Sequence, residues 1–90
     1  MIIDKEQLME VLAEEECLTA DRFDDALVGF TCGANTVAVY DMNRMIDILV
    51  AEGMEHDDAV EHIDYNVIGS YVGEKTPIYV GFVTEEVHNY

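Results

Sequence analysis

Basic residues are scarce in this sequence. Four Lys and Arg stand against 20 Asp and Glu, which gives a formal net charge of −16 at pH 7. Phosphate groups repel a chain of that charge, so direct binding to nucleic acid is excluded, and so is binding to an anionic membrane surface. Half of the residues are hydrophobic, and this predicts a folded core in spite of the charge.

Long apolar runs and a secretion signal are also missing. No stretch approaches the ~20 consecutive apolar residues that span a bilayer, and no basic region followed by an apolar run comes after Met1. Cys17 and Cys32 are the only cysteines and show neither CxxC nor zinc spacing. We therefore expect a cytoplasmic protein with two reduced cysteines in its core.

Motifs for catalysis are missing as well. No Gly-rich phosphate loop follows a predicted strand, and no nucleophile elbow is present. Carboxylates without an apolar pocket stay ionised and make poor general acids. His56 and His62 are six residues apart, so they face different sides of a helix. The sequence predicts a protein that is not an enzyme and needs no cofactor.

Residues 1–90 are predicted to form one α+β domain, because a chain of this length has no room for a second core. The spacing of apolar residues predicts a helix over 4–16. Asp4 is the expected N-cap, and Gln7 three residues later completes a capping box. Thr19 is expected to cap a second, short helical turn.

A β-hairpin and two further helices are expected next. The β-rich runs 26–32 and 36–41 flank the turn sequence Gly33-Ala34-Asn35, which is typical of a hairpin. Apolar residues at three- and four-residue spacing then predict helices over 42–52 and 55–71. The second of these helices is expected to bury a stripe that extends to its last turn.

The last part of the chain predicts a third strand. Asp41 and Gly53 are expected to begin and end the helix between them, Gly73 to end the next one, and Pro77 to open a strand over 78–83. Since the two helices form a hairpin, we expect the last strand to run antiparallel to the second strand. The predicted fold is a three-stranded, mainly antiparallel sheet covered by helices, in the order α-β-β-α-α-β.

The acids concentrate on the predicted helices. Residues 1–25 carry nine acids and 43–72 carry seven, whereas 26–42 carry only Asp41. Acids three or four residues apart on a helix lie about 5–6 Å apart between Cβ atoms, close to the phosphate spacing along one nucleic-acid strand. The candidate partner-binding residues are Glu14, Glu15, Glu16, Asp24, Asp25, Glu55, Asp57, Asp58, Glu61 and Asp64.

Three interpretations of these acids are open. In the first interpretation, the acids are a decoy for the basic groove of a nucleic-acid-binding protein, since a groove built for phosphates accepts ordered carboxylates. Alternatively, they are the solubilising or salt-adapted surface of a structural or homo-oligomerising module. Divalent-metal binding is the second alternative, although EF-hand spacing is absent and the acids fall on helices. We favour the decoy.

Asn66 is a polar residue near the apolar stripe of a predicted helix. An unpaired amide is unfavourable in that position. We therefore expect Asn66 to be structural and to bond a backbone group of the neighbouring strand or loop.

Five stretches of the chain carry a resemblance to known proteins: Asp24–Gly29, Val39–Asp41, Met45–Leu49, Gly53–Val60 and Tyr65–Pro77. On these stretches the chain resembles a family of small acidic proteins of tailed phages and prophages. The family has no established activity, so the resemblance implies a setting, the cytoplasm of a host cell. In that setting we expect a DNA mimic that inhibits a host nuclease, defence complex or transcription factor and so serves evasion of host defence.

Overall fold

The structure is a computed structural model that describes residues 3–68 and 71–83. Its first helix, α1 (Lys5–Glu14), begins as predicted. The carboxylate of Asp4 accepts a hydrogen bond from the Gln7 N–H (2.8 Å), and the Gln7 side chain accepts one from the Asp4 N–H (3.0 Å). This capping box satisfies two of the free N–H groups at the start of the helix.

A 3₁₀ segment, η1 (Asp21–Ala26), follows α1. Its N-cap is Ala20, which has no side-chain cap, so the prediction that Thr19 caps this turn is wrong. The hydroxyl of Tyr40 instead accepts a hydrogen bond from the Ala20 N–H at 2.8 Å. A buried side chain of the sheet thus replaces the expected local cap.

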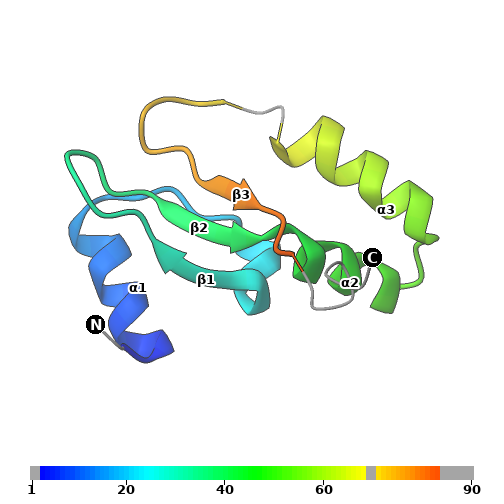
Figure 1. Cartoon of the computed structure of the whole chain (residues 1–90), viewed down its shortest axis with the longest axis horizontal. Coiled ribbons are helices and arrows are strands. Elements are labelled where there is room, and N and C mark those ends of the chain that lie inside the picture. Colours follow the sequence, from blue (N-terminus) through cyan, green and yellow to red (C-terminus); the bar gives the residue numbers. More distant parts are fainter. Residues whose placement is uncertain (1–2, 69–70, 84–90) are drawn as a thin grey trace.

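The sheet has three strands in the order β1-β2-β3 (Figure 1). Strands β1 (Leu27–Phe30) and β2 (Ala38–Asp41) form the predicted antiparallel hairpin. Strand β3 (Ile78–Val80) pairs with β2 in parallel, so the sheet is mixed. The predicted element order is confirmed, but the prediction that the last strand runs antiparallel to the second is wrong.

Helix α2 (Met42–Ala51) has the predicted ends. The carboxylate of Asp41 accepts hydrogen bonds from the N–H groups of Asn43 and Arg44. Gly53 lies just past the other end with a φ of 107°, which strains any residue with a Cβ atom. Short-range sequence signals therefore determine both ends of this helix.

Helix α3 (His56–Ile63) is shorter than predicted. It continues as a π-helical turn, η2 (Asp64–Ile68), and residues 69 and 70 of the predicted helix lie outside the described residues. Tyr71, expected in the buried stripe, is 75% exposed, and Gly73 belongs to a turn of the connection to β3. Helical spacing therefore continues in the sequence beyond the end of the helix itself.

The connection between α3 and β3 explains the direction of the last strand. Helix α3 returns toward the sheet, and the chain then continues to the hairpin end of β1 and β2 before it turns (Figure 1). There, Asn35 Nδ2 donates to the carbonyl of Glu74 (2.6 Å) and Lys75 Nζ donates to that of Thr36 (3.1 Å). Starting from this end, β3 has to run in the same direction as β2.

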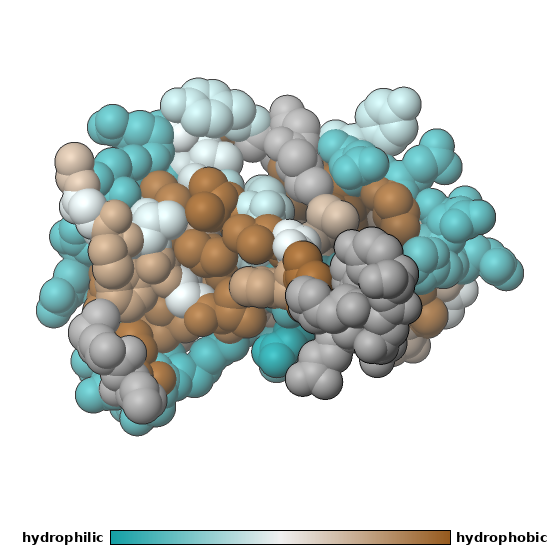
Figure 2. Space-filling model, in the orientation of Figure 1, coloured by the Kyte–Doolittle hydropathy of each residue, from teal (hydrophilic) through white to brown (hydrophobic). Residues whose placement is uncertain are grey.

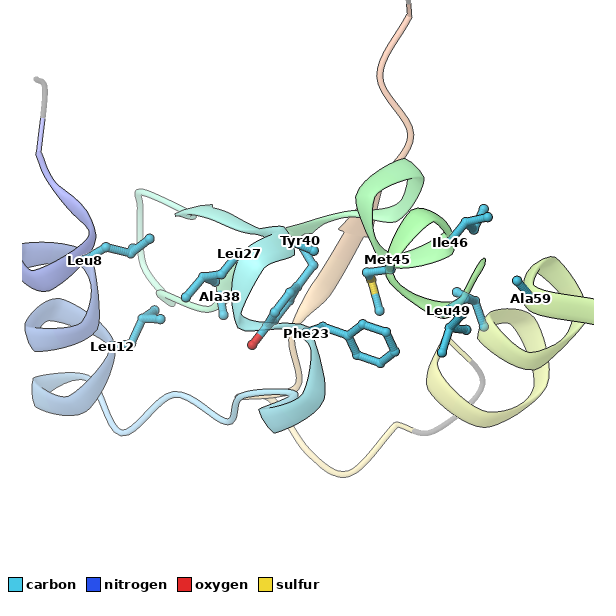
Figure 3. Close-up of a cluster of buried hydrophobic side chains, with 12 residues drawn as sticks. Leu8, Leu12, Phe23, Leu27, Ala38, Tyr40, Met45, Ile46, Leu49 and Ala59 are labelled. Carbon is cyan, nitrogen blue, oxygen red and sulfur yellow. The ribbon is translucent and has the colours of Figure 1, made fainter. Parts of the chain in front are cut away.

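The hydrophobic core lies on one side of the sheet and extends from α1 to α3 (Figure 3). Leu8 and Leu12 of α1 face Leu27 and Ala38 of the sheet, and Tyr40 lies in the middle. Helix α3 packs mainly on α2. Within the described residues, no helix is long and apolar enough to cross a bilayer.

The two cysteines differ in their surroundings. Cys17 is half-buried, its thiol donates to the Thr36 carbonyl (3.1 Å), and burial raises its pKa. Cys32 is exposed beside the hairpin turn, so the prediction of two core cysteines is wrong for Cys32. Both thiols are free.

Tyr40 is the largest fully buried side chain of the core. Its ring stacks on Tyr79 with centroids 5.8 Å apart. Burial raises the pKa of both phenols above the ordinary value of about 10. Because the folded state favours the protonated form, this contribution to stability is complete below about pH 10 and is lost as the pH rises through the folded-state pKa.

We expect Tyr40→Phe to lower the free energy of unfolding at neutral pH by about 1–3 kcal/mol, because the Ala20 N–H loses its acceptor. The difference between wild type and variant should shrink above about pH 10, where Tyr40 ionises only in the wild type. Urea unfolding from neutral to alkaline pH measures both effects. A difference that is independent of pH would contradict the role given to the buried hydroxyl.

Candidate acidic interaction surface

Both lysines bind backbone groups inside the fold. Lys5 Nζ donates to the carbonyls of Asp24 and Leu27, the latter at 3.0 Å, and so connects α1 to the end of η1. Lys75 Nζ donates to Thr36, as described above. Neither ammonium group neutralises a candidate acid by a direct ion pair.

Both arginines pair with acids outside the candidate set. Arg22 is hydrogen-bonded to Glu52, and this contact raises the pKa of the guanidinium. Arg44 Nε lies 3.5 Å from a carboxylate oxygen of Asp41. Within residues 3–68 and 71–83, none of the candidate acids therefore forms an ion pair with Lys or Arg, and Asp57 lies 3.7 Å from the Nδ1 atom of His56.

Helix α3 carries the most regular group of candidate acids. Glu55 is its N-cap residue, and Asp57 and Asp58 lie in its first turn, where the helix dipole favours negative charge. Glu61 and Asp64 follow, and all five side chains are exposed. Asp57, Glu61 and Asp64 are four and three residues apart, so they follow one face of the helix. We call these three side chains the α3 acidic row.

A shallow hollow of about 380 Å³ lies beside this row. It is lined by Met54, Asp58, Glu61, His62, Tyr65 and Asn66. Tyr65 is 78% exposed, and Asn66 Nδ2 lies 3.4 Å from His62 Nδ1. Asn66 is thus an exposed neighbour of His62, and the partner that the structure gives it is not the backbone group that we expected.

The remaining candidate acids lie elsewhere on the molecule. Glu14, Glu15 and Glu16 are at the end of α1, at the opposite end of the 37 Å long axis from α3 (Figure 1). Glu16 has a φ of 57°, so the helical spacing of this cluster stops there. Asp24 and Asp25 are exposed on η1, between the two ends. The structure therefore separates the candidate acids into three groups.

The space-filling view shows where hydrophilic and apolar residues lie on one face of the molecule (Figure 2). On the visible face, hydrophilic residues gather at the two ends of the molecule, and an apolar patch covers the strands between them. Asp41 is the only acid in the three strands, so the prediction that the sheet is nearly neutral is confirmed.

Part of this surface was not found by sequence reasoning. Met54 and Tyr65 line the hollow beside the α3 acidic row, but no motif marks them. The only signal is that Tyr65 falls outside the apolar stripe of its helix. Among the described residues, no group of three His, Cys, Asp or Glu side chains is placed to hold a metal ion.

Comparisons of the chain with protein-family models, with characterised proteins and with solved structures gave no match. The function of the chain is therefore inferred from the geometry and chemistry of its surface.

Salt should stabilise the fold. With 20 acids and only four bases, repulsion between like charges exceeds attraction between opposite charges at pH 7. Raising NaCl from about 0.01 M to about 1 M shortens the screening length from about 30 Å to about 3 Å. We expect the melting temperature to rise over this range, as measured by thermal unfolding at constant pH. A flat or falling melting temperature would mean that repulsion between the acids does not limit stability.

Proposed function

We propose that this chain is a non-catalytic binding protein, a DNA mimic whose α3 acidic row occupies the basic nucleic-acid-binding surface of another protein. The observation that carries the proposal is the distribution of charge partners. All four basic side chains bind other groups of the same chain, so the row has no Lys or Arg partner among the described residues. A basic surface of another molecule would supply the missing charges.

The geometry of α3 suits such a surface. Asp57, Glu61 and Asp64 project from successive turns, with a repeat of about 5–6 Å. The helix fixes the backbone that carries these carboxylates before binding, which reduces the backbone entropy lost on association. Exposed Tyr65 lies in the adjacent hollow, where an arginine could stack on its ring while pairing with a carboxylate. Complementary charge would also accelerate the encounter.

The resemblance to small acidic proteins of phages and prophages supports one class of partner. In that setting the protein would act in the cytoplasm of the host cell, as an inhibitor of a nuclease, a defence complex or a transcription factor. Evasion of host defence is the corresponding role. The proposal requires no cofactor, no membrane and no direct contact with nucleic acid.

The experiment that tests the proposal is capture from host lysate on immobilised wild-type protein, at low and at high salt. A captured protein that binds nucleic acid and is released by added DNA or by salt supports the proposal, because both agents compete with the carboxylates. A captured protein that holds DNA and this chain at the same time would contradict it.

A further inference from the structure

The hollow beside the α3 acidic row is lined mainly by residues of α3 and η2. Asp58, Glu61 and Tyr65 are three and four residues apart, so their side chains project from the same side of the segment into this hollow. We call it the Tyr65 hollow. Glu61 belongs both to the hollow and to the α3 acidic row. A partner that follows the row therefore also meets the hollow.

The Tyr65 hollow combines negative charge with flat and polarisable surfaces. Asp58 and Glu61 supply two carboxylates, and in the part of the chain that the structure describes neither side chain forms a hydrogen bond or an ion pair. The ring of Tyr65 is 78% exposed, although a large aromatic side chain gains from burial. The thioether of Met54 adds a soft apolar wall. The hollow is thus complementary to a cation that also has a flat, weakly hydrated surface.

The other two lining residues contact one another. Asn66 Nδ2 lies 3.4 Å from His62 Nδ1, and the His62 side chain is half-buried. The lining of the hollow contains no lysine or arginine. The groups that it presents to a partner are therefore the two carboxylates and the ring of Tyr65.

Arginine and lysine differ in how well they fit such a site. A guanidinium is planar and weakly hydrated and has its donors in a fork, so it stacks on an aromatic ring and pairs with a carboxylate at the same time. An ammonium is compact and strongly hydrated, and it pairs as a point charge. Glu61 precedes Tyr65 by four residues, which places their Cβ atoms about 5–6 Å apart. One guanidinium can reach both side chains.

We propose that the Tyr65 hollow is a subsite for an arginine side chain of the partner, and that it makes this surface select arginine over lysine. This proposal rests on the proposed function, since a basic surface has to approach the α3 acidic row. The guanidinium lies on the ring of Tyr65 and donates to the carboxylates of Asp58 and Glu61. The row attracts any cation, whereas the hollow discriminates between cations. Surfaces that bind phosphates and bases use arginine for bidentate contacts, so the subsite suits that class of partner.

Calorimetric titration at low salt with two peptides of equal charge, hexa-arginine and hexa-lysine, tests this proposal. The wild type should bind hexa-arginine about five-fold more tightly than hexa-lysine, the gain expected from a stacked guanidinium. Tyr65→Ala should remove most of this preference and leave the affinity for hexa-lysine nearly unchanged. Tyr71→Ala is the matched control and should keep the preference. Tyr71 is 75% exposed, compared with 78% for Tyr65, but it lines a separate hollow that includes Ile78 of β3.

A conservative variant completes the test. Tyr65→Phe retains the ring and should keep the preference for hexa-arginine, which separates stacking from any other effect of changing this residue. Equal affinity of the wild type for the two peptides would overturn the arginine subsite, and so would an unchanged preference in Tyr65→Ala or a lost preference in Tyr71→Ala. None of these results bears on competition with DNA, which is measured on the captured partner. Failure of the subsite and failure of the proposed function are therefore distinguishable.

Discussion

Replacement of Leu49 by Ala is expected to lower the free energy of unfolding by about 2–5 kcal/mol, the range for deleting a fully buried leucine. Leu49 is 0% exposed and lies in the core between the sheet and α3, close to Met45 and Ala59 (Figure 3). The chain has only 90 residues, so this loss is a large share of its total stability.

Val50→Ala is the matched control for Leu49→Ala. Val50 is the next residue of α2 and is 41% exposed, so its truncation should change stability by less than about 1 kcal/mol. Urea unfolding at pH 7 measures both variants. Equal losses in the two variants would show that the core does not extend between α2 and α3 as described.

Reversal of the α3 acidic row is the second large effect expected. Asp57→Lys, Glu61→Lys and Asp64→Lys together should weaken binding to the captured partner about ten-fold or more, because attraction becomes repulsion at three adjacent points. Most of the loss should be in the association rate, and the slope of affinity against salt should become smaller. Surface plasmon resonance at several salt concentrations gives both quantities. The substituted side chains are exposed, so the fold should persist.

The acids at the end of α1 provide a control of equal charge. Glu14→Lys, Glu15→Lys and Glu16→Lys also raise the net charge by six, so each triple variant has a net charge of −10 in place of −16. This cluster lies at the opposite end of the molecule from α3. We expect the α1 variant to bind nearly as well as the wild type. If both variants lose the same affinity, net charge and not the α3 surface determines binding.

Local signals in the sequence predicted much of this fold. The capping box of Asp4 and Gln7, the hairpin turn and the ends of α2 each depend on residues within a few positions of one another. The residues that make each of these contacts are therefore visible in a short stretch of sequence. Their prediction from the sequence therefore succeeded.

The features of the fold that were not predicted from the sequence depend on long-range contacts. The direction of β3 depends on the bonds of Asn35 to Glu74 and of Lys75 to Thr36, each between residues 39 positions apart. Helical spacing continues past η2 up to Tyr71, although the helix itself has ended. Periodicity alone cannot show where tertiary contacts end a helix.

The candidate surface, too, was predicted where it depends on local spacing and missed where it depends on the whole fold. The row on α3 follows from residue spacing and was predicted, because exposed acids on one helix face need no tertiary contact to be placed. The separation of Glu14 from Asp57 by the length of the molecule depends on the whole fold. The same holds for the exposure of Ile78 on β3, since it depends on which side of the strands the helices pack.

The central claim is that the α3 acidic row and nucleic acid occupy the same surface of the partner. The most direct measurement is a calorimetric titration of the captured partner with this protein, in the absence and in the presence of saturating DNA. We predict that DNA lowers the apparent affinity in proportion to its own occupancy, and that the protein displaces DNA in the reverse titration. An affinity that is unchanged by bound DNA, with formation of a ternary complex, would contradict the claim.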